Sequence, residues 1–407
     1  MDSTERLKDR KKRFRVAVRR FGPFESGVAK QWEAFEADAR TCLQLELVPM
    51  DFDALFEATV GRKNELGLDA ALINTDWVAT ACRRNALMDL SDLILRDPPK
   101  GYPEDWAPSM LRLQSMDGLI LGLPYHDGPE CLVYRKDLFE EANEQVPETW
   151  EEFLCLARTF HEPEKGLYGT LFAAYPDGHN TVYDFCLQLW TRGGELVNAD
   201  GNFCFDSPHV MEALSFLREV INDQSAVHPA CRKMDSVKSG LAFASGEVAM
   251  MVNWFGFAAM ASCMAESKVR GKVGVAPVPH ALGTLATSLN IYWLLSIPAS
   301  SFHKQIAWQF LRHCASAPMD KLLTLEGGIG CRRSTWVDQE VNSTIPFYSK
   351  LEELHLGARE MPRMEQWPQV GKIIERMVLA SIDTCASIKS ISMTAQSEVE
   401  ELLQRRG

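Results

Sequence analysis

Four places in the chain set an aromatic side chain beside a hydrogen-bonding one, each where the pattern of helices and strands is interrupted. They are Asn74-Thr-Asp76-Trp77, Tyr125-His126-Asp127, Asn253-Trp254 and Asn290-Ile-Tyr292-Trp293. The flat face of a ring covers apolar C–H groups, whereas carboxylates and amides hydrogen-bond to hydroxyl groups. A carbohydrate presents both kinds of surface, so these residues predict a sugar-binding site.

Each of these rings has a competing interpretation as a core residue. Trp77 begins a helix that continues with Val78 and Ala81, so core and binding site are equally good interpretations of it. The same two interpretations stay open for Trp254. Trp293 lies in the middle of a predicted strand, which favours the core and places Tyr292 on the opposite face.

Motifs for catalysis, nucleotide binding and metal binding are missing from the sequence. There is no GxxxxGK[ST] loop and no GxGxxG fingerprint after a strand. His161-Glu162 is not followed by the second histidine of a zinc-binding helix, and the 9 histidines and 11 cysteines are scattered. The sequence cannot pair its many carboxylates into an acid/base dyad. We therefore expect a protein that is not an enzyme and that holds neither a metal nor a cofactor.

Composition limits the partners and the compartment. The 407 residues carry 43 basic and 55 acidic side chains, and this net charge of −12 argues against a nucleic-acid partner. No stretch approaches the ~20 apolar residues of a membrane-spanning helix. The chain as written begins with a basic tail (residues 1–13) and shows no secretory signal, and its odd number of cysteines, without a CxxC pair, predicts free thiols. For the chain as written, these features predict a cytoplasmic protein. We also expect a monomer.

The first part of the chain alternates strands and helices. Strands are predicted at residues 14–18, 43–47 and 70–73, and helices at residues 28–39 and 52–66. This order indicates an α/β domain with a largely parallel sheet, in which ligands bind beyond the carboxyl ends of the strands. The loops at residues 20–24 and 74–77 are therefore candidate binding loops.

The remainder of the chain has extended breaks between helical stretches. Residues 147–153 predict a helix start in which Thr149 and Glu152 form a capping box, and helical patterns then dominate to about residue 264. A further strand is predicted at residues 290–297. The length favours two lobes, and the extended breaks near Tyr125 and Pro277 are predicted to be crossings between them, while the glycines near Gly328 form a third flexible break.

A series of short motifs resembles the family 1 extracellular solute-binding proteins, the family of maltodextrin-binding-like ABC importer components. The motifs follow one another in the family's order and cover nearly the whole chain. They are Asp117-Gly-Leu-Ile-Leu-Gly-Leu-Pro-Tyr125, Leu132-Val-Tyr-Arg-Lys-Asp-Leu-Phe139, Pro147-Glu-Thr-Trp-Glu-Glu-Phe153, Phe243-Ala-Ser-Gly-Glu-Val-Ala-Met-Met251, Val275-Ala-Pro-Val-Pro279, Ala307-Trp-Gln-Phe-Leu311 and Gly327-Gly328.

The resemblance implies a fold and a function. The fold is the two-lobed α/β periplasmic-binding-protein-like fold of type II, with three crossings and a ligand cleft between lobes that close about hinges. Lobe 1 is expected to contain residues 14–124 and 280–328, and lobe 2 residues 125–279 and 329–407. The expected ligand is a sugar or oligosaccharide, and the expected partner is the permease of an ABC importer.

The ligand-binding residues expected from this resemblance and from the ring pairs form one set. It comprises Phe21, Gly22, Asp76, Trp77, Tyr125, His126, Asp127, Asn253, Trp254, Asn290 and Tyr292. The family acts outside the cytoplasm, whereas the chain as written predicts a cytoplasmic protein. A second hypothesis therefore stays open, an intracellular relative that binds or senses a metabolite, or an enzyme on the same fold.

Overall fold

The computed structural model of the protein describes residues 12–61 and 66–404. The basic tail predicted at residues 1–13 lies almost entirely outside the described residues, and Arg13 already belongs to a strand. The described residues form two compact units, each of which combines a sheet with helices. Unit 1 contains the residues up to Gly128, Asn290–Glu352 and Met361–Trp367, and unit 2 contains Pro129–Leu289, Glu353–Glu360 and the residues from Pro368 onward.

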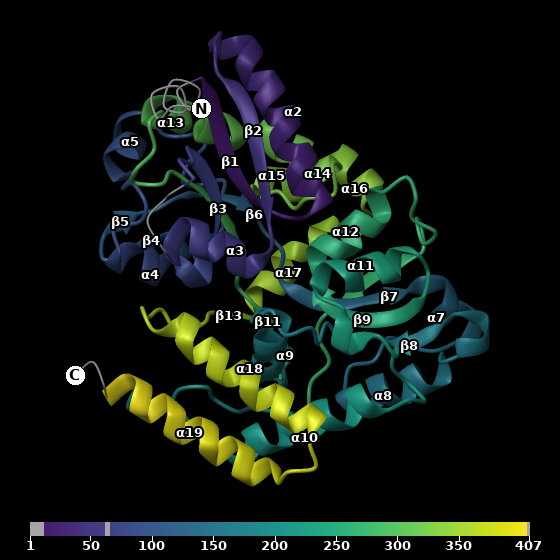
Figure 1. The fold of residues 1–407 in the computed structure, drawn as a ribbon. Coiled ribbons are helices and arrows are strands. Elements are labelled where there is room, and N and C mark those ends of the chain that lie inside the picture. The colour runs from purple at the N-terminus through teal and green to yellow at the C-terminus, as the bar shows by residue number, and fades with distance from the viewer. Residues whose placement is uncertain (1–11, 62–65, 405–407) are drawn as a thin grey trace, which may run out of the picture. The chain divides into compact units, whose positions relative to one another are not determined.

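The central sheet of unit 1 has the strand order β2-β1-β3-β12-β6 (Figure 1). Its strands are β1 (Arg13–Arg19), β2 (Gln44–Met50), β3 (Ala70–Asn74), β6 (Leu123–His126) and β12 (Trp293–Ser296). β1 runs parallel to both β2 and β3, as predicted, but β12 is antiparallel to β3 and β6. The sheet is therefore mixed, because a strand from late in the chain is inserted between two early ones.

The strands and helices predicted for the first 73 residues are confirmed in unit 1. α2 (Gly22–Ala39) starts with Pro23 in its first turn, where the fixed φ of proline suits a helix. Its apolar face packs on β1 and α13, where Phe14 and Trp32 stack at 4.7 Å and Phe310 packs edge-on against both. The helix predicted at residues 52–66 is present as α3 (Phe52–Phe56) and the π-helical turn η1 (Glu57–Gly61), and residues 62–65 lie outside the described part.

The remaining elements of unit 1 are short helices and a hairpin. They are η2 (Thr75–Trp77), α4 (Val78–Arg83), α5 (Ser91–Arg96), α6 (Pro108–Leu113), β4 (Ser115–Met116), β5 (Leu119–Ile120), α13 (Lys304–Cys314), α14 (Ala317–Leu325), α15 (Arg333–Trp336), α16 (Gln339–Thr344) and η5 (Tyr348–Lys350), followed by α17 (Leu351–Leu356), which ends in unit 2.

The sheet of unit 2 has the strand order β10-β7-β9-β8. Its strands are β7 (Glu130–Arg135), β8 (Tyr168–Thr170), β9 (Val248–Trp254) and β10 (Val273–Ala276). The prediction that helical patterns dominate up to residue 264 was wrong for β9, which is buried along its whole length. A strand buried on both faces shows a continuous apolar run instead of alternation, and such a run cannot be distinguished from a buried helix by periodicity.

α8, α11 and α12 pack against this sheet, and α10 packs against α9 and α19 (Figure 1). The predicted capping box at the start of α8 is confirmed, since the Glu152 backbone N–H donates to Thr149 Oγ1 (3.2 Å) and the Thr149 N–H donates to Glu152 Oε2 (3.1 Å). The other elements of unit 2 are α7 (Lys136–Ala142), α8 (Trp150–Thr159), η3 (Pro163–Lys165), α9 (Asn180–Trp190), α10 (Pro208–Asn222), η4 (Cys231–Lys233), α11 (Ser236–Ala244), α12 (Phe255–Cys263), the strand pair β11 (Ser288–Leu289) and β13 (Ala358–Arg359), α18 (Trp367–Asp383) and α19 (Ile388–Gln404).

The boundaries of the units differ from the expected lobes mainly after residue 328. Residues 329–352 were expected in lobe 2, but they belong to unit 1. The physical reason is a set of contacts there: the buried Arg332 forms an ion pair with the partly exposed Asp105 (2.7 Å) and lies 4.4 Å from the Trp106 ring centroid. Residues 280–289, which were expected in lobe 1, belong to unit 2 through the pairing of β11 with β13.

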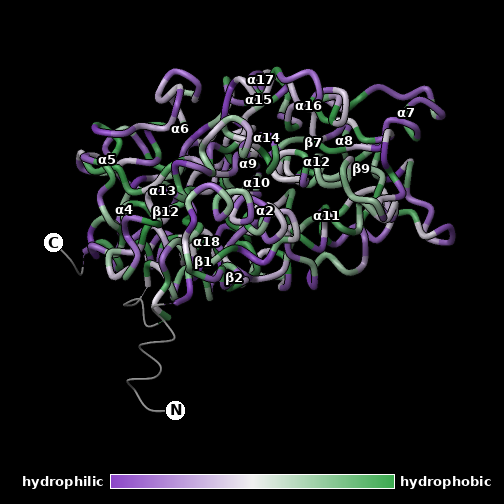
Figure 2. Tube along the Cα trace, turned by 90° about the horizontal axis from the view of Figure 1, so that it is seen from above, coloured by the Kyte–Doolittle hydropathy of each residue, from purple (hydrophilic) through white to green (hydrophobic). Residues whose placement is uncertain are grey.

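Hydrophobic residues follow the packing of each unit. β9 is largely hydrophobic and α7 largely hydrophilic in Figure 2, in line with full burial of the strand and with Phe139 as the buried residue of the helix. Among the described residues, no helix has both the length and the apolar character needed to cross a bilayer. All 11 cysteines lie in the described part and are free thiols, of which Cys42, Cys155 and Cys385 are exposed.

Candidate functional site

One edge of the unit 1 sheet collects three of the predicted ring pairs. β3 and β6 end there and β12 begins there, because Trp293 is paired with Asn74 on one side and with His126 on the other. Residues 74–77, 125–127 and 290–293, which are far apart in the sequence, are therefore neighbours in the fold. This is the edge at which α/β sheets bind ligands.

An aromatic cluster forms the apolar part of this edge. The Trp293 ring packs edge-on against Trp77 (centroids 5.8 Å apart), Phe24 (6.0 Å) and Phe52 (6.3 Å). Trp77 is only 3% exposed and also contacts Phe52 at 4.9 Å, so its surroundings are those of a core residue. Trp293 is partly exposed at the start of β12 although it packs against these rings, so it is less buried than the core position predicted for it.

Tyr292 and Asn290 lie just before β12 and are buried. The Tyr292 hydroxyl donates to the Met110 carbonyl, and its backbone N–H donates to Thr75 Oγ1 (3.2 Å). These bonds direct the Tyr292 side chain into unit 1. Asn290 is 3% exposed.

His126 is the polar centre of the unit 1 edge. Its Nδ1 accepts a hydrogen bond from the Ile329 N–H (2.9 Å), and the Asp127 N–H donates to the Ile329 carbonyl (3.0 Å). Burial lowers the pKa of His126 to about 3, against the opposing effect of Asp127. The imidazole is therefore neutral, and because Nδ1 accepts, its proton is on Nε2.

Two further predicted residues, Tyr125 and Asp76, form hydrogen bonds within unit 1. Tyr125 donates its hydroxyl to Gln31 Oε1 (2.8 Å), and burial raises its pKa well above the usual value. Asp76 accepts from Trp367 Nε1 at 2.9 Å, while its N–H donates to Asn74 Oδ1 (3.0 Å). Asp76 keeps partial exposure, whereas Tyr125 is buried.

The loop after β1 borders the same edge. Phe21 precedes α2, and its ring contacts Phe24 edge-on at 5.1 Å and His126 at 6.4 Å. Gly22 is exposed, and a Cβ at this position would meet nothing within 4 Å. The space beside Gly22 is therefore open, with the Phe21 ring adjacent to it.

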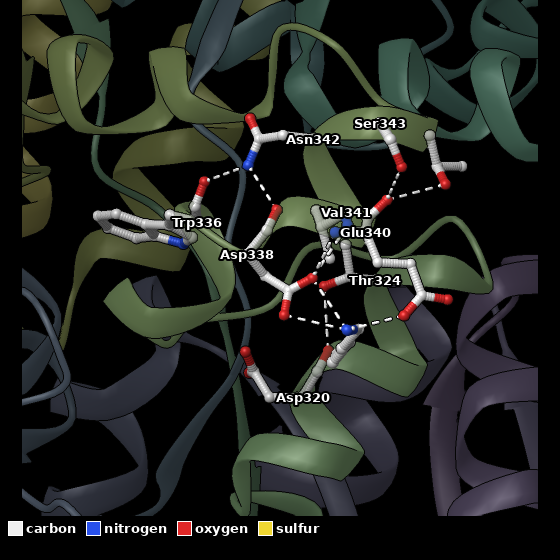
Figure 3. A network of polar contacts seen from close by, with 10 residues as sticks. Asp320, Thr324, Trp336, Asp338, Glu340, Val341, Asn342 and Ser343 are labelled. Atoms are coloured by element: carbon white, nitrogen blue, oxygen red, sulfur yellow. Dashed lines mark hydrogen bonds and ion pairs between the residues drawn. The ribbon is translucent and has the colours of Figure 1, made fainter.

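The segment that binds His126 is anchored to α14, and α14 is joined to α16 by the polar network of Figure 3. Asp320 on α14 accepts from the backbone N–H groups of Cys331 (2.8 Å) and Arg332 (3.2 Å), and burial raises its pKa to about 6. Asp338, which caps α16, accepts from Lys321 of α14 at 2.9 Å. These bonds join α14 to α16 and fix the backbone that carries Ile329.

The unit 2 sheet has a comparable edge where β9 ends and β7 begins. Glu130 is paired with Trp254 in this sheet. Asn253 is 1% exposed, its Oδ1 accepts from the Trp254 N–H (2.9 Å) and its Nδ2 donates to the Ser236 carbonyl (3.3 Å). The Trp254 Nε1–H donates to Asn180 Oδ1 (3.1 Å).

Three residues at this edge, Glu130, Asn180 and Asp184, are not among the predicted binding residues. Asn180 Nδ2 donates to Glu130 Oε1 (3.4 Å). Burial raises the pKa values of Glu130 and Asp184 well above their usual values. The charge of Asp184 raises the pKa of Glu130 further. No spacing rule could have paired them, because a strand and a helix that are distant in the sequence bring them together.

The two edges offer binding chemistry. Each presents an indole beside amide, carboxyl or imidazole groups, and this combination suits a ligand with apolar faces and hydroxyl groups. Among the described residues, no group of three or more His, Cys, Asp and Glu side chains is arranged to hold a metal ion.

Comparison with known proteins gives a consistent result. A family model described as bacterial extracellular solute-binding protein matches residues 30–333. A probable ABC transporter-binding protein of Deinococcus radiodurans is 23% identical over 339 residues, which are 81% of this chain and 78% of the relative. The mannitol-binding protein of Pseudomonas aeruginosa is 28% identical over 298 residues, which are 68% of this chain and 65% of the relative.

A solved structure supports the fold. The ABC transporter solute-binding protein of Agrobacterium radiobacter K84 in complex with ribitol has a TM-score of 0.86 and 24% sequence identity, and the match covers 96% of this chain and 98% of that one. The predicted fold class, a two-lobed α/β periplasmic-binding-protein-like fold, is confirmed.

Proposed function

The chain belongs to the bacterial extracellular solute-binding protein family, and on this premise we propose that it binds a sugar or sugar alcohol without transforming it. In this proposal it is the substrate-binding component of an ABC importer and delivers its ligand to a permease. The observation that carries the proposal is the recurrence of one arrangement in both units, a tryptophan beside hydrogen-bonding groups at the sheet edge. Relatives named for mannitol and ribitol agree with a ligand rich in hydroxyl groups.

The residues at the edges fall into two roles in this proposal. Trp293 and Trp254 supply ring faces, and Asp76, His126 and Asn253 supply polar contacts or fix the backbone that does. Phe21 and Gly22 border the ligand at the loop after β1. The remaining predicted residues support the edge from inside unit 1 and are not proposed to contact the ligand. They are Trp77, Tyr125, Asp127, Asn290 and Tyr292.

The first experiment measures binding by thermal shift and calorimetry with D-mannitol, ribitol and maltose. A ligand at about 100 times its Kd adds about 2.7 kcal/mol to the free energy of unfolding. Trp254→Ala and Trp293→Ala should each weaken binding by roughly one to two decades in Kd. Phe302→Ala is the matched control, because Phe302 is 55% exposed and follows the other end of β12.

Unchanged binding in both tryptophan variants would contradict the site, and failure to bind any polyol or sugar would contradict the ligand class. Bound ligand recovered from the protein should be chemically intact by mass spectrometry. A transformed ligand would instead favour an enzyme.

Hinge closure, which the family resemblance implied, is part of the same proposal. Small-angle scattering should show a smaller radius of gyration at saturating ligand, because ligand contacts from both units favour a closed state. An unchanged scattering curve at saturation would argue that binding does not involve closure.

A further inference from the structure

Two carboxyl groups are buried together at the unit 2 edge. Glu130 is fully buried at the start of β7, and Asp184 in the second turn of α9 is 7% exposed. Both pKa values are raised by burial, and the charge of Asp184 contributes to the shift of Glu130. Two ionised carboxylates side by side in an apolar interior repel each other, so such a pair retains a proton.

Two oxygens of this pair need that proton. Among the described residues, Glu130 Oε2 and Asp184 Oδ1 are buried and have no hydrogen-bond partner. Carboxylate oxygens only accept, so two of them cannot bond to each other unless one carries hydrogen. A single shared proton would supply the missing hydrogen bond for both oxygens.

The Asn180 amide connects the pair to Trp254. Its Nδ2 donates to Glu130 Oε1 (3.4 Å), and a hydrogen bond from Asn180 also stabilises the charged form of Asp184. With the NH₂ group held by these acceptors, the amide oxygen faces the other way. There Oδ1 accepts from Trp254 Nε1 (3.1 Å) and lies 2.8 Å from His179 Nδ1, which therefore carries the proton.

The Trp254 ring is thus held by a directional bond and by two rings. His179 packs at 5.4 Å and Tyr183 packs edge-on at 5.6 Å. These rings limit the tilt of the indole, and the bond from Nε1 to Asn180 adds a directional contact that ring packing does not supply. The direction of Asn180 is in turn set by the carboxyl pair.

We propose that Glu130 and Asp184 share one proton and act through the Asn180 amide as positioning residues for the Trp254 ring. The consequence for ligand affinity rests on the proposed function, whereas the positioning itself is measurable without ligand. His179 and Tyr183 are the other titratable residues near Glu130 and Asp184. The neighbouring strands β9 and β11 contribute the uncharged Asn253 and Ser288. Ser288 Oγ donates to the Glu130 carbonyl (2.6 Å).

The test uses the full chain with ¹⁵N-labelled indoles. Trp254→Phe identifies the Trp254 signal among the 10 tryptophans. Asn180→Asp keeps the shape but removes the NH₂ donors and adds a third carboxylate, so the Trp254 signal should shift or broaden. Asn198→Asp, an exposed amide elsewhere in unit 2, is the matched control and should leave it in place.

Conservative replacement of Glu130 shows whether it positions the Trp254 ring through hydrogen bonds or only fills space. Glu130→Gln carries its own N–H donor and should keep the Trp254 signal, whereas Glu130→Ala should displace it like Asn180→Asp. A difference infrared spectrum at neutral pH should show the C=O band of a carboxylic acid that is lost in Glu130→Gln and in Asp184→Asn. The nine other indole signals report whether each variant is folded.

D-mannitol and ribitol are the probes for function. Asn180→Asp should raise Kd for the bound probe about tenfold, and Glu130→Gln should change it by about twofold or less. A Trp254 signal that stays in place in folded Asn180→Asp, or an absent acid band, would overturn the inference. If neither probe binds the native protein, the proposed ligand class fails, and the indole signals still decide the positioning role.

Discussion

The two sheet edges use the same kind of ring but hold it by different means. In unit 1, Trp293 is surrounded by other aromatic rings, and the nearby His126 is neutral. In unit 2, Trp254 is fixed by a hydrogen bond to Asn180, behind which lie Glu130 and Asp184. The first edge depends mainly on packing, and the second on the placement of a proton.

This difference gives the edges opposite responses to pH. A buried histidine with a lowered pKa stabilises the fold above its unfolded pKa, and this stability is lost as the pH falls. A buried carboxyl pair with raised pKa values is most favourable at low pH and loses stability as the pH rises through them. The two units therefore respond to pH in opposite directions, unit 1 losing stability in acid and unit 2 as the pH rises.

The largest expected effect comes from a buried tryptophan of the unit 1 edge. Trp77→Ala should lower the free energy of unfolding by about 3–5 kcal/mol, because it leaves a large cavity among Phe52, Phe56 and Trp293. Trp293→Ala should cost less stability, since Trp293 is already partly exposed, yet weaken ligand binding more. Denaturant unfolding and calorimetry on the same variants separate these effects.

Trp308→Ala serves as the control for this comparison. Trp308 is buried in α13, so its removal should lower stability and leave affinity nearly unchanged. If Trp77→Ala lost affinity with its stability intact, the description of the unit 1 edge as a packed cluster would be wrong.

The second-largest expected effect is the loss of stability at low pH that protonation of His126 causes. The pKa of His126 is lowered from 6.5 to about 3, so its contribution is complete above pH 6.5 and falls as the pH drops toward 3. At about 1.4 kcal/mol per pKa unit, the loss has an upper limit of roughly 5 kcal/mol. His126→Asn keeps an acceptor for the Ile329 N–H but cannot be protonated, so its acid destabilisation should be smaller.

The measurement is Tm against pH for both proteins. Asp320 has the opposite effect on stability, because its pKa is raised to about 6 and its stabilisation is lost as the pH rises. Both proteins contain Asp320, so its effect cancels in the difference between their Tm values. Parallel curves for the native protein and His126→Asn would show that His126 does not control the acid limb.

The smallest expected effect lies away from either edge. Thr149→Ala removes the acceptor for the Glu152 N–H at the start of α8 and should cost about 1 kcal/mol of stability in unit 2. Thr149→Ser should restore most of it. Ligand affinity is expected to stay constant, and a change would mean that α8 influences the unit 2 edge.

Periodicity and capping signals predicted the local structure of unit 1 and of α8 well. Alternation identified β1 and β2, and residue types alone identified the capping box of Thr149 and Glu152. These features depend on neighbours within a few residues. β9 was missed because its continuous apolar run carries no period.

The site was predicted less completely, for a related reason. Rings and amides at breaks in the pattern pointed to residues 74–77, 125–127 and 253–254, which do lie at sheet edges. The exposure of Trp293 depends on where β12 begins, and the pairing of Glu130 with Asp184 depends on how a strand meets a helix. Such relations arise from tertiary structure, and a single sequence does not display them.

The insertion of β12 between β3 and β6 has a consequence for how the protein is made. The unit 1 sheet cannot be completed until residue 296 has left the ribosome, although β1, β2, β3 and β6 emerge much earlier. At about 5–20 residues per second, synthesis of the intervening Pro129–Leu289 takes roughly 10–30 s. During that time the nascent N-terminal part has strand edges without partners. Assembly of this sheet therefore waits for the synthesis of most of unit 2, and the edges of β3 and β6 that receive β12 stay unpaired until then.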